Sequence, residues 1–474
     1  MQPIPRRWRP PTVLADRIRK KEAPTPRSGS SRHNTDNRVG DAIESVHLDA
    51  ARGEVKILAG GTVVSSLLNA VGITSLDVRV ASRVVKGDGN VEVALVLDNS
   101  GSMAGQPIAD LATAAQNLVG VVFTGAEQSD RVKVAVVPFS GAVNVGADNK
   151  DSAWIDQAGI SPINGANFAT NVPRLQMFDK LNADWRGCVE ARPAPHDTTD
   201  SAAVTSQPET LFVPMFAPDE PDSNNDDGAS YGNSYIADDG GACTPQPTVC
   251  TSYNRRGTCT QWQKTPLAAA TAQSRTCKYD GATVPSTVPG PNYMCDSSSI
   301  LPLTATRSEI DAKLGGMAAK GNTNIPEGIM WGWRALSPGA PLTEGRPYET
   351  PNNDKVLVLM TDGANTYTAT SNHNKSYYGA HGYGAAGRLG TTYTNAAYVS
   401  RMNQKTQAAC TNAKAAGIKI YTVAFRLETD PTTLSLLQGC ATEASMAFRA
   451  SDGAALVAAF ERIGSEISKL RVSG

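Results

Sequence analysis

The sequence predicts an α/β fold in which helices cover both faces of a mostly parallel, doubly wound sheet. Nearly continuous apolar runs, typical of buried parallel strands, alternate along the chain with segments that have helical apolar spacing. Polar side chains follow two of these runs directly, as ligand sites do in such sheets. The main predicted strands are Val91–Leu97, Arg131–Phe139, Lys355–Met360 and Ile418–Phe425, with a short fifth at Met446–Arg449.

The helices between these strands are predicted from apolar side chains that recur every three or four residues. The last helix shows one apolar face most plainly, through Leu456, Phe460, Ile463, Ile467 and Leu470. Pro107 suits a first helical turn, where its missing N–H costs nothing. The other predicted helices are Pro107–Val122, Glu309–Ala319, Ile325–Ala335 and Ala396–Ala416.

Composition divides the 474 residues into four parts. Residues 1–45 form a basic, proline-rich tail that we expect to be disordered, and residues 46–90 form a small strand-containing segment. Residues 91–140 and 301–474 make up the α/β domain. Residues 141–300, the first insertion, contain six of the eight cysteines and the acidic run Asp219–Asp227, which we expect to face solvent. A second insertion, Ala364–Thr394, is rich in Tyr, Gly and Asn and lacks core periodicity.

Several classes of function are poorly supported by composition and motifs. The formal net charge of −1 excludes a general nucleic-acid binder. The sequence contains no C-x-x-C pair, so a zinc site is poorly supported. The cysteines indicate disulfides in an oxidising compartment instead, with free cytosolic thiols as the alternative. Neither Ser100 nor Ser102 lies in a G-x-S-x-G motif, no histidine is placed as a base, and no phosphate-binding loop occurs.

Three separated pieces of sequence predict a metal site. In Asp98-Asn99-Ser100-Gly101-Ser102 the oxygen side chains fall at alternate positions after a strand, where they can converge. By itself this could be a polar turn leading into a helix. Thr323 precedes a predicted helix, however, and Asp362 follows the strand Lys355–Met360, so all three pieces belong at one sheet edge. Such hard oxygen ligands suit Mg²⁺ or Mn²⁺.

This set of five residues resembles the metal-ion-dependent adhesion site of the von Willebrand factor type A (vWA) domain, which has a Rossmann-like fold. The resemblance covers the two parts of the α/β domain. It implies that Ser100, Ser102 and Thr323 bind the ion directly, and that Asp98 and Asp362 act through water or hydrogen bonds. It also implies a non-enzymatic protein that binds an Asp or Glu carboxylate of a partner.

Several segments resemble the TadG-like proteins of bacterial Tad/Flp pilus assembly, among them LVLDNSGSM, FVPMFAPDEPD, GNTNIPEGIMWGWRALSP and IYTVAF. The likeness implies a periplasmic or surface-facing protein of the cell envelope, with pilus-assembly or surface proteins as partners and no nucleic acid. That family begins with one membrane-spanning helix, whereas Met1–Gly40 has no apolar run of that length. We expect the natural start to lie upstream; the alternative is a paralogue without the anchor.

The resemblance also bears on the cysteines. Cys410 and Cys440 are expected to meet across a helix and the following loop, and Cys188 and Cys295 to close the first insertion. A bridge across so long a loop stabilises by on the order of 4 kcal/mol. The remaining cysteines, Cys243, Cys250, Cys259 and Cys277, allow three pairings.

Aromatic residues of the second insertion are candidates for partner contact, because the insertion follows Asp362 and aromatic loops suit recognition. The alternative is an ordinary solvated loop. The candidates are Tyr367, Tyr377, Tyr378, His381 and Tyr383. Two other functions remain open: a cytosolic vWA scaffold with reduced thiols, and a metal-assisted hydrolase. The hydrolase needs a general base, for which Glu327 is the nearest residue, although we expect Glu327 to cap or pack.

Overall fold

A computed structural model describes residues 38–49, 54–64, 75–85, 89–222 and 225–473. The chain divides into two compact units, residues 1–86 and residues 87–474, which are described separately. Most of the tail predicted to be disordered, residues 1–37, lies outside the described residues.

The first unit contains a three-stranded antiparallel sheet in the order β1–β2–β3. Its strands are β1 (Arg38–Asp49), β2 (Glu54–Val64) and β3 (Ser75–Val85). The prediction that residues 38–45 belong to a disordered tail is therefore wrong. Two irregularities in the pairing of β1, at Val39/Asp41 and Ile43/Ser45, interrupt the two-residue alternation that would have revealed the strand.

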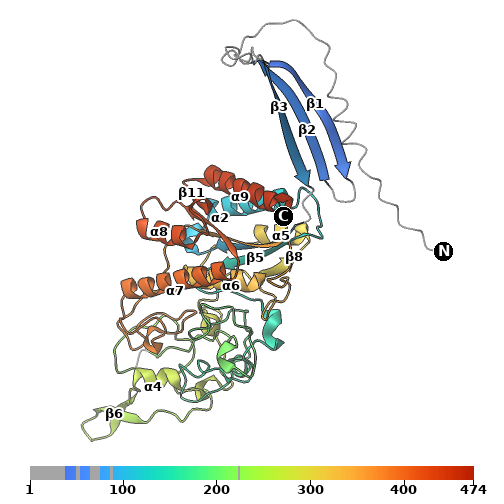
Figure 1. The fold of residues 1–474 in the computed structure, drawn as a ribbon. Coiled ribbons are helices and arrows are strands. Elements are labelled where there is room, and N and C mark those ends of the chain that lie inside the picture. Colours follow the sequence, from blue (N-terminus) through green and yellow to red (C-terminus); the bar gives the residue numbers. More distant parts are fainter. Residues whose placement is uncertain (1–37, 50–53, 65–74, 86–88, 223–224, 474) are drawn as a thin grey trace, which may run out of the picture. The chain divides into compact units, whose positions relative to one another are not determined.

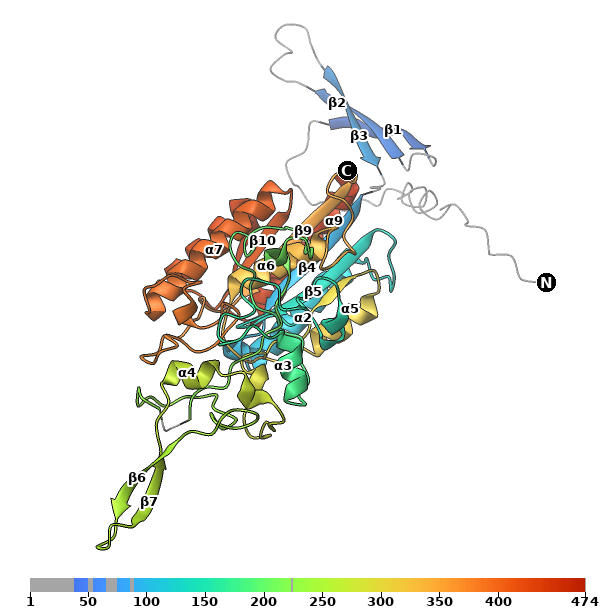
Figure 2. The same ribbon diagram turned by 90° about the horizontal axis from the view of Figure 1, so that it is seen from below.

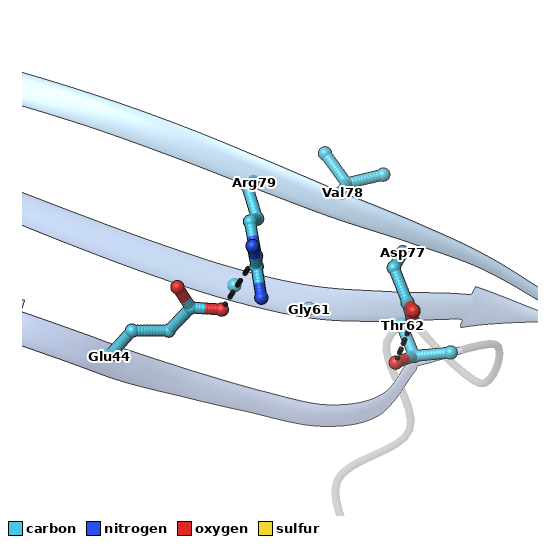
Figure 3. A pocket seen from close by; sticks show the side chains of 7 residues that line it. Glu44, Gly61, Thr62, Asp77, Val78 and Arg79 are labelled. Atoms are coloured by element: carbon cyan, nitrogen blue, oxygen red, sulfur yellow. Dashed lines mark hydrogen bonds and ion pairs between the residues drawn. The ribbon is translucent and has the colours of Figure 1, made fainter.

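One face of this sheet carries a small polar cluster (Figure 3). The Thr62 hydroxyl donates to Asp77 Oδ1 at 2.8 Å, and Arg79 Nε lies 3.1 Å from Glu44 Oε1. Gly60 leaves room for Glu44, since a Cβ atom there would lie 2.4 Å from its carboxylate oxygen. Both members of the ion pair are exposed, so the pair contributes little to stability.

The second unit is built on a six-stranded sheet in the order β11-β10-β9-β4-β5-β8. All neighbouring strands are parallel except β8, which pairs antiparallel with β5. The mostly parallel sheet is thus confirmed, while the edge strand β8 was not predicted. The strands are β4 (Asn90–Asp98), β5 (Val132–Phe139), β8 (Leu301–Thr304), β9 (Asn353–Thr361), β10 (Lys419–Phe425) and β11 (Ala447–Ala450).

Helices cover both faces of this sheet (Figure 1). One face packs against α2 (Gln106–Val122), α5 (Arg307–Gly315) and α9 (Gly453–Ser473). The other face packs against α6 (Ile325–Leu336), α7 (Asn395–Ala415) and α8 (Pro431–Cys440). The side chains of β4 alternate between the two cores, with Val93 and Leu95 in one and Ala94 and Val96 in the other. Of the six helices, only α8 was not predicted.

Helix α6 lies unusually close to the sheet because of two glycines. A Cβ atom at Gly332 would lie 2.3 Å from Val96 Cγ2, and one at Gly328 would lie 2.8 Å from the Phe139 ring. Any side chain at either position would push the helix outward. The close approach brings the start of α6, and the loop before it, to the carboxyl ends of β4 and β5.

The two insertions pack together in one lobe next to this sheet edge (Figures 1 and 2). The Tyr378 hydroxyl and Arg388 Nη1 of the second insertion both lie 2.6 Å from the Glu190 carboxylate of the first. Gln273 and Asn374 exchange two buried amide hydrogen bonds. Regular elements of the lobe are α3 (Arg174–Lys180), β6 (Thr248–Tyr253), β7 (Cys259–Lys264) and α4 (Ala269–Ser274), with short 3₁₀ turns between them.

The acidic run of the first insertion does not simply face solvent, contrary to prediction. Asp219 is fully buried and lies 2.7 Å from the equally buried Lys278. Glu220 is also buried and accepts a hydrogen bond from the Tyr383 hydroxyl. The carboxylates at the start of the run therefore have specific partners inside the lobe, which composition alone does not reveal.

All eight cysteines form disulfides. The expected pairs Cys188–Cys295 and Cys410–Cys440 are confirmed. The four cysteines whose pairing was open form Cys243–Cys277 and Cys250–Cys259. Among the helices in the described part of the chain, none has both the length and the apolar character that crossing a bilayer requires.

Candidate functional site

The candidate site lies where β4 and β9 end. Both strands run parallel and side by side, so Asp98 at the end of β4 and Asp362 directly after β9 reach the same edge. Beyond Asp98 the chain makes a tight turn, the 3₁₀ helix η2 (Gly101–Met103), before α2 begins. This turn places the side chains of Ser100 and Ser102 toward Asp362.

The hydroxyls and carboxylates of this edge form a continuous set of contacts. Ser100 Oγ lies 3.1 Å from Ser102 Oγ, and the Ser102 hydroxyl donates to Asp362 Oδ1 at 2.7 Å. The Ser100 amide donates to Asp98 Oδ1 at 2.8 Å, and the Thr361 hydroxyl donates to Asp98 Oδ2 at 2.5 Å. Asp98 is buried and Ser102 is exposed, so the cluster opens to solvent on the Ser102 side.

Thr323 reaches this cluster from a third segment. A Cβ atom built on Gly363 would lie 3.8 Å from Thr323 Oγ1 and 4.0 Å from Ser102 Oγ, so both hydroxyls face one point beside Gly363. The Gly101 amide donates to Gly321 O at 2.9 Å, and the Thr366 amide donates to Thr323 O at 2.9 Å. Backbone hydrogen bonds therefore tie the Thr323 loop to both neighbouring loops.

The electrostatics of the site favour a cation. Burial removes water from the Asp98 carboxyl and raises its pKa to about 6, although the hydrogen bonds from the Thr361 hydroxyl and the Ser100 amide oppose this effect. Burial also raises the pKa of Asp362, although the Ser102 hydroxyl opposes this effect. A divalent ion beside the two carboxylates would stabilise their charged forms.

The donor set matches a hard divalent ion. Hydroxyl and carboxylate oxygens are the ligands that Mg²⁺ prefers. In the described ranges of the chain, no three His, Cys, Asp or Glu side chains gather in a way that could hold a metal ion. The candidate site is of another kind, because hydroxyls supply three of its five side chains. When bound, the ion would supply an electrophilic centre that accepts an outside carboxylate.

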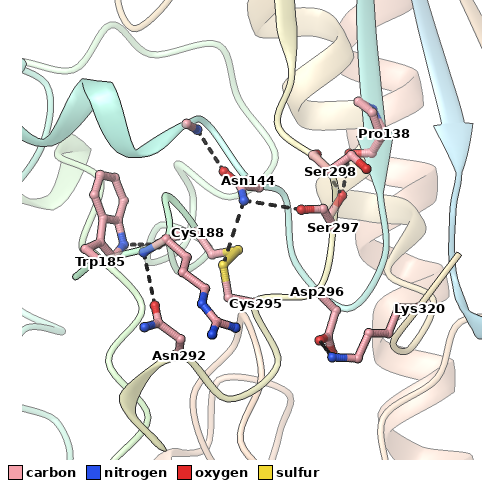
Figure 4. Close-up of a disulfide and its surroundings, with 12 residues drawn as sticks. Pro138, Asn144, Trp185, Cys188, Asn292, Cys295, Asp296, Ser297, Ser298 and Lys320 are labelled. Atoms are coloured by element: carbon pink, nitrogen blue, oxygen red, sulfur yellow. Dashed lines mark hydrogen bonds and ion pairs between the residues drawn. A yellow bond between two sulfur atoms is a disulfide. The ribbon is translucent and has the colours of Figure 1, made fainter. Parts of the chain in front are cut away.

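A disulfide braces the same loops (Figure 4). Directly after Cys295, Asp296 forms an ion pair with Lys320 at 2.6 Å, two residues before Asn322 and the Thr323 loop. The next residue, Ser297, has its hydroxyl 3.2 Å from Asn99 Oδ1 and 3.0 Å from Pro138 O. Residues 295–297, held by the bridge to Cys188, therefore contact both the β4 loop and the segment before Thr323.

Several residues that hold the site were not singled out from the sequence. The Asn99 side chain donates to Ala318 O at 2.9 Å, and its carbonyl accepts from the Lys320 amide at 2.8 Å. Gly101 lies close to the Thr323 loop, because a Cβ atom on it would meet Gly321 O at 3.4 Å. Asn365 Oδ1 accepts the first amide of α6 at 2.8 Å.

Most of the aromatic residues predicted to contact a partner are buried. Tyr367, Tyr378, His381 and Tyr383 are buried, and only Tyr377, at 41% exposure, faces solvent. The first four are wrong as partner-binding residues, because their side chains are buried, and two of them join the second insertion to the first. Tyr378 binds Glu190, for example, and Tyr383 binds Glu220. The alternative of an ordinary solvated loop is also wrong.

Glu327, the nearest candidate for a general base, is buried in the first turn of α6. Burial raises the pKa of its carboxyl, while Arg334 on the same helix opposes the effect. The cap of α6 is Asn324, whose side chain accepts from the Glu327 amide. Glu327 is therefore packed in the interior of the second unit, as expected.

No protein-family profile and no curated protein matches the sequence. Similar solved structures include the open conformation of the pilus adhesin SpaC from Lactobacillus rhamnosus GG, with 11% identity over 90% of this chain and a TM-score of 0.36. This chain spans 33% of SpaC.

Two further solved structures are similar to a comparable degree. The vWF domain of the type V pilus tip protein Mfa5 from Porphyromonas gingivalis has 12% identity and a TM-score of 0.35, over 80% of this chain and 96% of that domain. The PilB minor pilin from Streptococcus sanguinis has 12% identity and a TM-score of 0.36, over 92% of this chain and 80% of that one. Likeness at these TM-scores carries no argument about function, which has to come from the residues themselves.

Proposed function

We propose that this chain is a non-enzymatic, metal-dependent binding protein with a vWA fold and a site of the metal-ion-dependent adhesion type. The single observation that carries the proposal is the convergence of Ser100, Ser102 and Thr323 with two carboxylates at one sheet edge. Thr323 and Asp362 lie more than two hundred residues after the Asp98–Ser102 segment, and a plain polar turn would not require them. Mg²⁺ or Mn²⁺ would bind there, and a partner's Asp or Glu would complete its coordination.

The setting of the proposed activity is pilus assembly or adhesion at the bacterial cell envelope, as for TadG-like proteins. The supporting feature is the pairing of all eight cysteines, since disulfides persist in oxidising compartments. The proposed partners are pilus-assembly or surface proteins with an exposed carboxylate, and membrane association belongs to the same proposal.

The test is a calorimetric titration of the whole protein with MnCl₂ and with MgCl₂. We expect one site, and we expect Asp98→Ala and Asp98→Asn to abolish binding. Asp156→Asn is the matched control, because Asp156 is also a fully buried carboxylate, but it lies in the first insertion and accepts from the amides of Ile160 and Ser161. Unchanged binding in the Asp98 variants, or equal loss in the control, would refute the site.

The alternative function is a metal-assisted hydrolase that uses the same ion. It would show metal-dependent turnover that is lost in Glu327→Gln, with metal affinity unchanged. The burial of Glu327 favours the binding function, because a buried carboxyl is poorly placed to act as a general base.

A further inference from the structure

A buried lysine and two buried aspartates form a cluster inside the lobe of the two insertions. Lys278 Nζ lies 2.7 Å from Asp219 Oδ2 and 3.5 Å from Asp238 Oδ1. The side chains of Lys278 and Asp219 are completely buried, and that of Asp238 is 4% exposed. The proposed metal site uses none of these groups, so the cluster is a separate feature of the lobe.

The two carboxylate oxygens nearest to the amine are poorly satisfied. Across the described ranges of the chain, no donor makes a well-formed hydrogen bond to Asp219 Oδ2 or Asp238 Oδ1, although both atoms are buried. Lys278 Nζ instead donates to the carbonyl oxygens of Asp219 and Ala272, at 3.1 and 2.9 Å. The amine therefore lies against the Asp219 carboxyl without the directional hydrogen bond that a stable buried ion pair makes.

Burial favours the uncharged forms of these groups. It raises the pKa of Asp219 to about 6, although Lys278 opposes the effect, and it also raises the pKa of Asp238. If all three groups were ionised, one lysine and two aspartates would leave an uncompensated negative charge away from water, which is costly. Transfer of the ammonium proton to Asp219 gives an amine beside a carboxylic acid, and these are the forms that react to give an amide.

The other oxygen of Asp219 is held where negative charge would develop in such a reaction. Asp219 Oδ1 accepts from the amides of Tyr235 and Ile236, at 2.6 and 2.9 Å. When an amine attacks the carboxyl carbon, the charge collects on this oxygen, and two fixed amides stabilise it as an oxyanion hole does. The amine, the carboxyl and the two amides are thus arranged for acyl transfer, with the reacting groups already in contact.

We propose that Lys278 and Asp219 form an intramolecular isopeptide bond, an amide between Nζ and Cγ, with Asp238 as the proton shuttle. Starting from the amine and the carboxylic acid, the nitrogen lone pair forms the C–N bond, and the carbonyl π pair moves to Oδ1. Asp238 Oδ1 takes a proton from the nitrogen and passes it to the Oδ2 hydroxyl. The carbonyl then re-forms, the C–Oδ2 bond breaks with its electron pair, and one water molecule leaves. Ala272 O remains an acceptor for the N–H of the product.

Another buried lysine of the same unit provides a contrast. Lys355 Nζ lies 2.5 Å from Glu92 Oε2, but Arg346 Nη1 lies 3.1 Å from Oε1 of the same carboxylate. Two cations stabilise the charge of this carboxylate, whereas in the other cluster one lysine is shared between two acids. We therefore expect an amide at Lys278 and an ordinary ion pair at Lys355.

The bond would close the base of the segment that carries the hairpin β6–β7 and α4. Asp219 and Lys278 are 59 positions apart, and the neighbouring Cys243–Cys277 bridge closes a separation of 34. An amide survives reductants that open a disulfide. This part of the lobe would therefore keep one covalent closure in a reducing medium.

The test is the intact mass of the whole protein after denaturation, reduction and alkylation. We expect a mass lower than the calculated one by one water molecule, and a tryptic digest with one peptide pair joined through Lys278 and Asp219. Lys278→Met and Asp219→Ala should restore the calculated mass, and so should Asp238→Asn, which cannot shuttle the proton. Lys264→Met is the matched control, because Lys264 makes an ion pair of the same 2.7 Å length with Asp239 at an exposed position; it should keep the loss of water.

The opposite outcomes are equally distinct. A native protein with the full calculated mass would refute the bond, and this result does not depend on whether any variant folds. A loss of water that persists in Lys278→Met would be a cyclic imide of an aspartate, and it would refute the bond as well. A bond that still forms in Asp238→Asn would remove Asp238 from the mechanism.

Discussion

Removal of the Cys188–Cys295 disulfide should weaken both the fold and the candidate metal site. The bridge closes a loop with a sequence separation of 107 residues, for which the chain-entropy relation gives about 4–5 kcal/mol of stability. The Cys250–Cys259 bridge closes a separation of only 9 residues, worth about 2–3 kcal/mol by the same relation. The double alanine variant at the long loop should therefore be the less stable by about 2 kcal/mol.

The two bridges also differ in what they touch. The long-loop bridge holds Asp296 and Ser297 against Lys320 and Asn99, which belong to the loops of the site. The short bridge joins the strands of the exposed hairpin β6–β7, which projects from the rest of the lobe (Figure 2). We therefore expect the first variant to lose Mn²⁺ affinity and the second to keep it.

The assay is urea unfolding of both variants, followed by tryptophan fluorescence, together with calorimetric titration of Mn²⁺ under conditions where each variant is folded. Amide hydrogen exchange of residues 99–103 and 320–323 without metal supplies a second readout and should increase only in the long-loop variant. Equal stability loss in the two variants would refute the entropy argument. Unchanged exchange and unchanged Mn²⁺ affinity in the long-loop variant would refute the brace.

Three other predictions follow from two buried carboxyl groups and from the close packing of α6 on the sheet. Burial raises the pKa of Asp98 to about 6, so the contribution of this carboxyl to the stability of the metal-free protein falls as the pH rises from about 4 to 6. The increase in melting temperature that Mg²⁺ produces should accordingly be larger at pH 7.5 than at pH 5, which scanning calorimetry measures. Gly332→Ala puts a methyl group against Val96 and should cost about 1–3 kcal/mol in denaturant unfolding. Lys278→Met leaves Asp219 buried without its partner and should cost about 3–5 kcal/mol, unlike the exposed Lys264→Met.

The sheet and its helices could be predicted because their signals are local. β4, β5, β9 and β10 are buried on both faces, so they are continuous apolar runs that any short window contains. α8 also carried a local signal that was overlooked. Asp430 caps it through the Thr433 amide, and Pro431 is its first residue.

The packing of the insertions could not be predicted in this way. Glu190 meets Arg388 across 198 residues, and neither side chain differs locally from a solvated charge. The same holds for Tyr378, whose hydroxyl donates to the Glu190 carboxylate. The sequence around such a residue has the composition of a solvated loop. Its buried hydrogen bond to a distant partner nevertheless stabilises the fold as a core contact does. The tyrosines of the second insertion were for this reason assigned to a surface.

The candidate site combines both kinds of information. Its five side chains follow from a motif and from the rule that parallel strands end together, whereas its support comes from residues that no motif contains. Hydroxyl ligands attract an ion only weakly, so an ion cannot be expected to gather three separate loops by itself. Backbone hydrogen bonds between Gly101 and Gly321 and between Thr366 and Thr323 hold the three hydroxyls together before an ion binds. The Asn99 side chain, which donates to Ala318 O, adds a further link between the loops. Residues 295–297, next to the Cys188–Cys295 bridge, contact those loops, so we expect the geometry of the site to depend on the oxidised state of the first insertion.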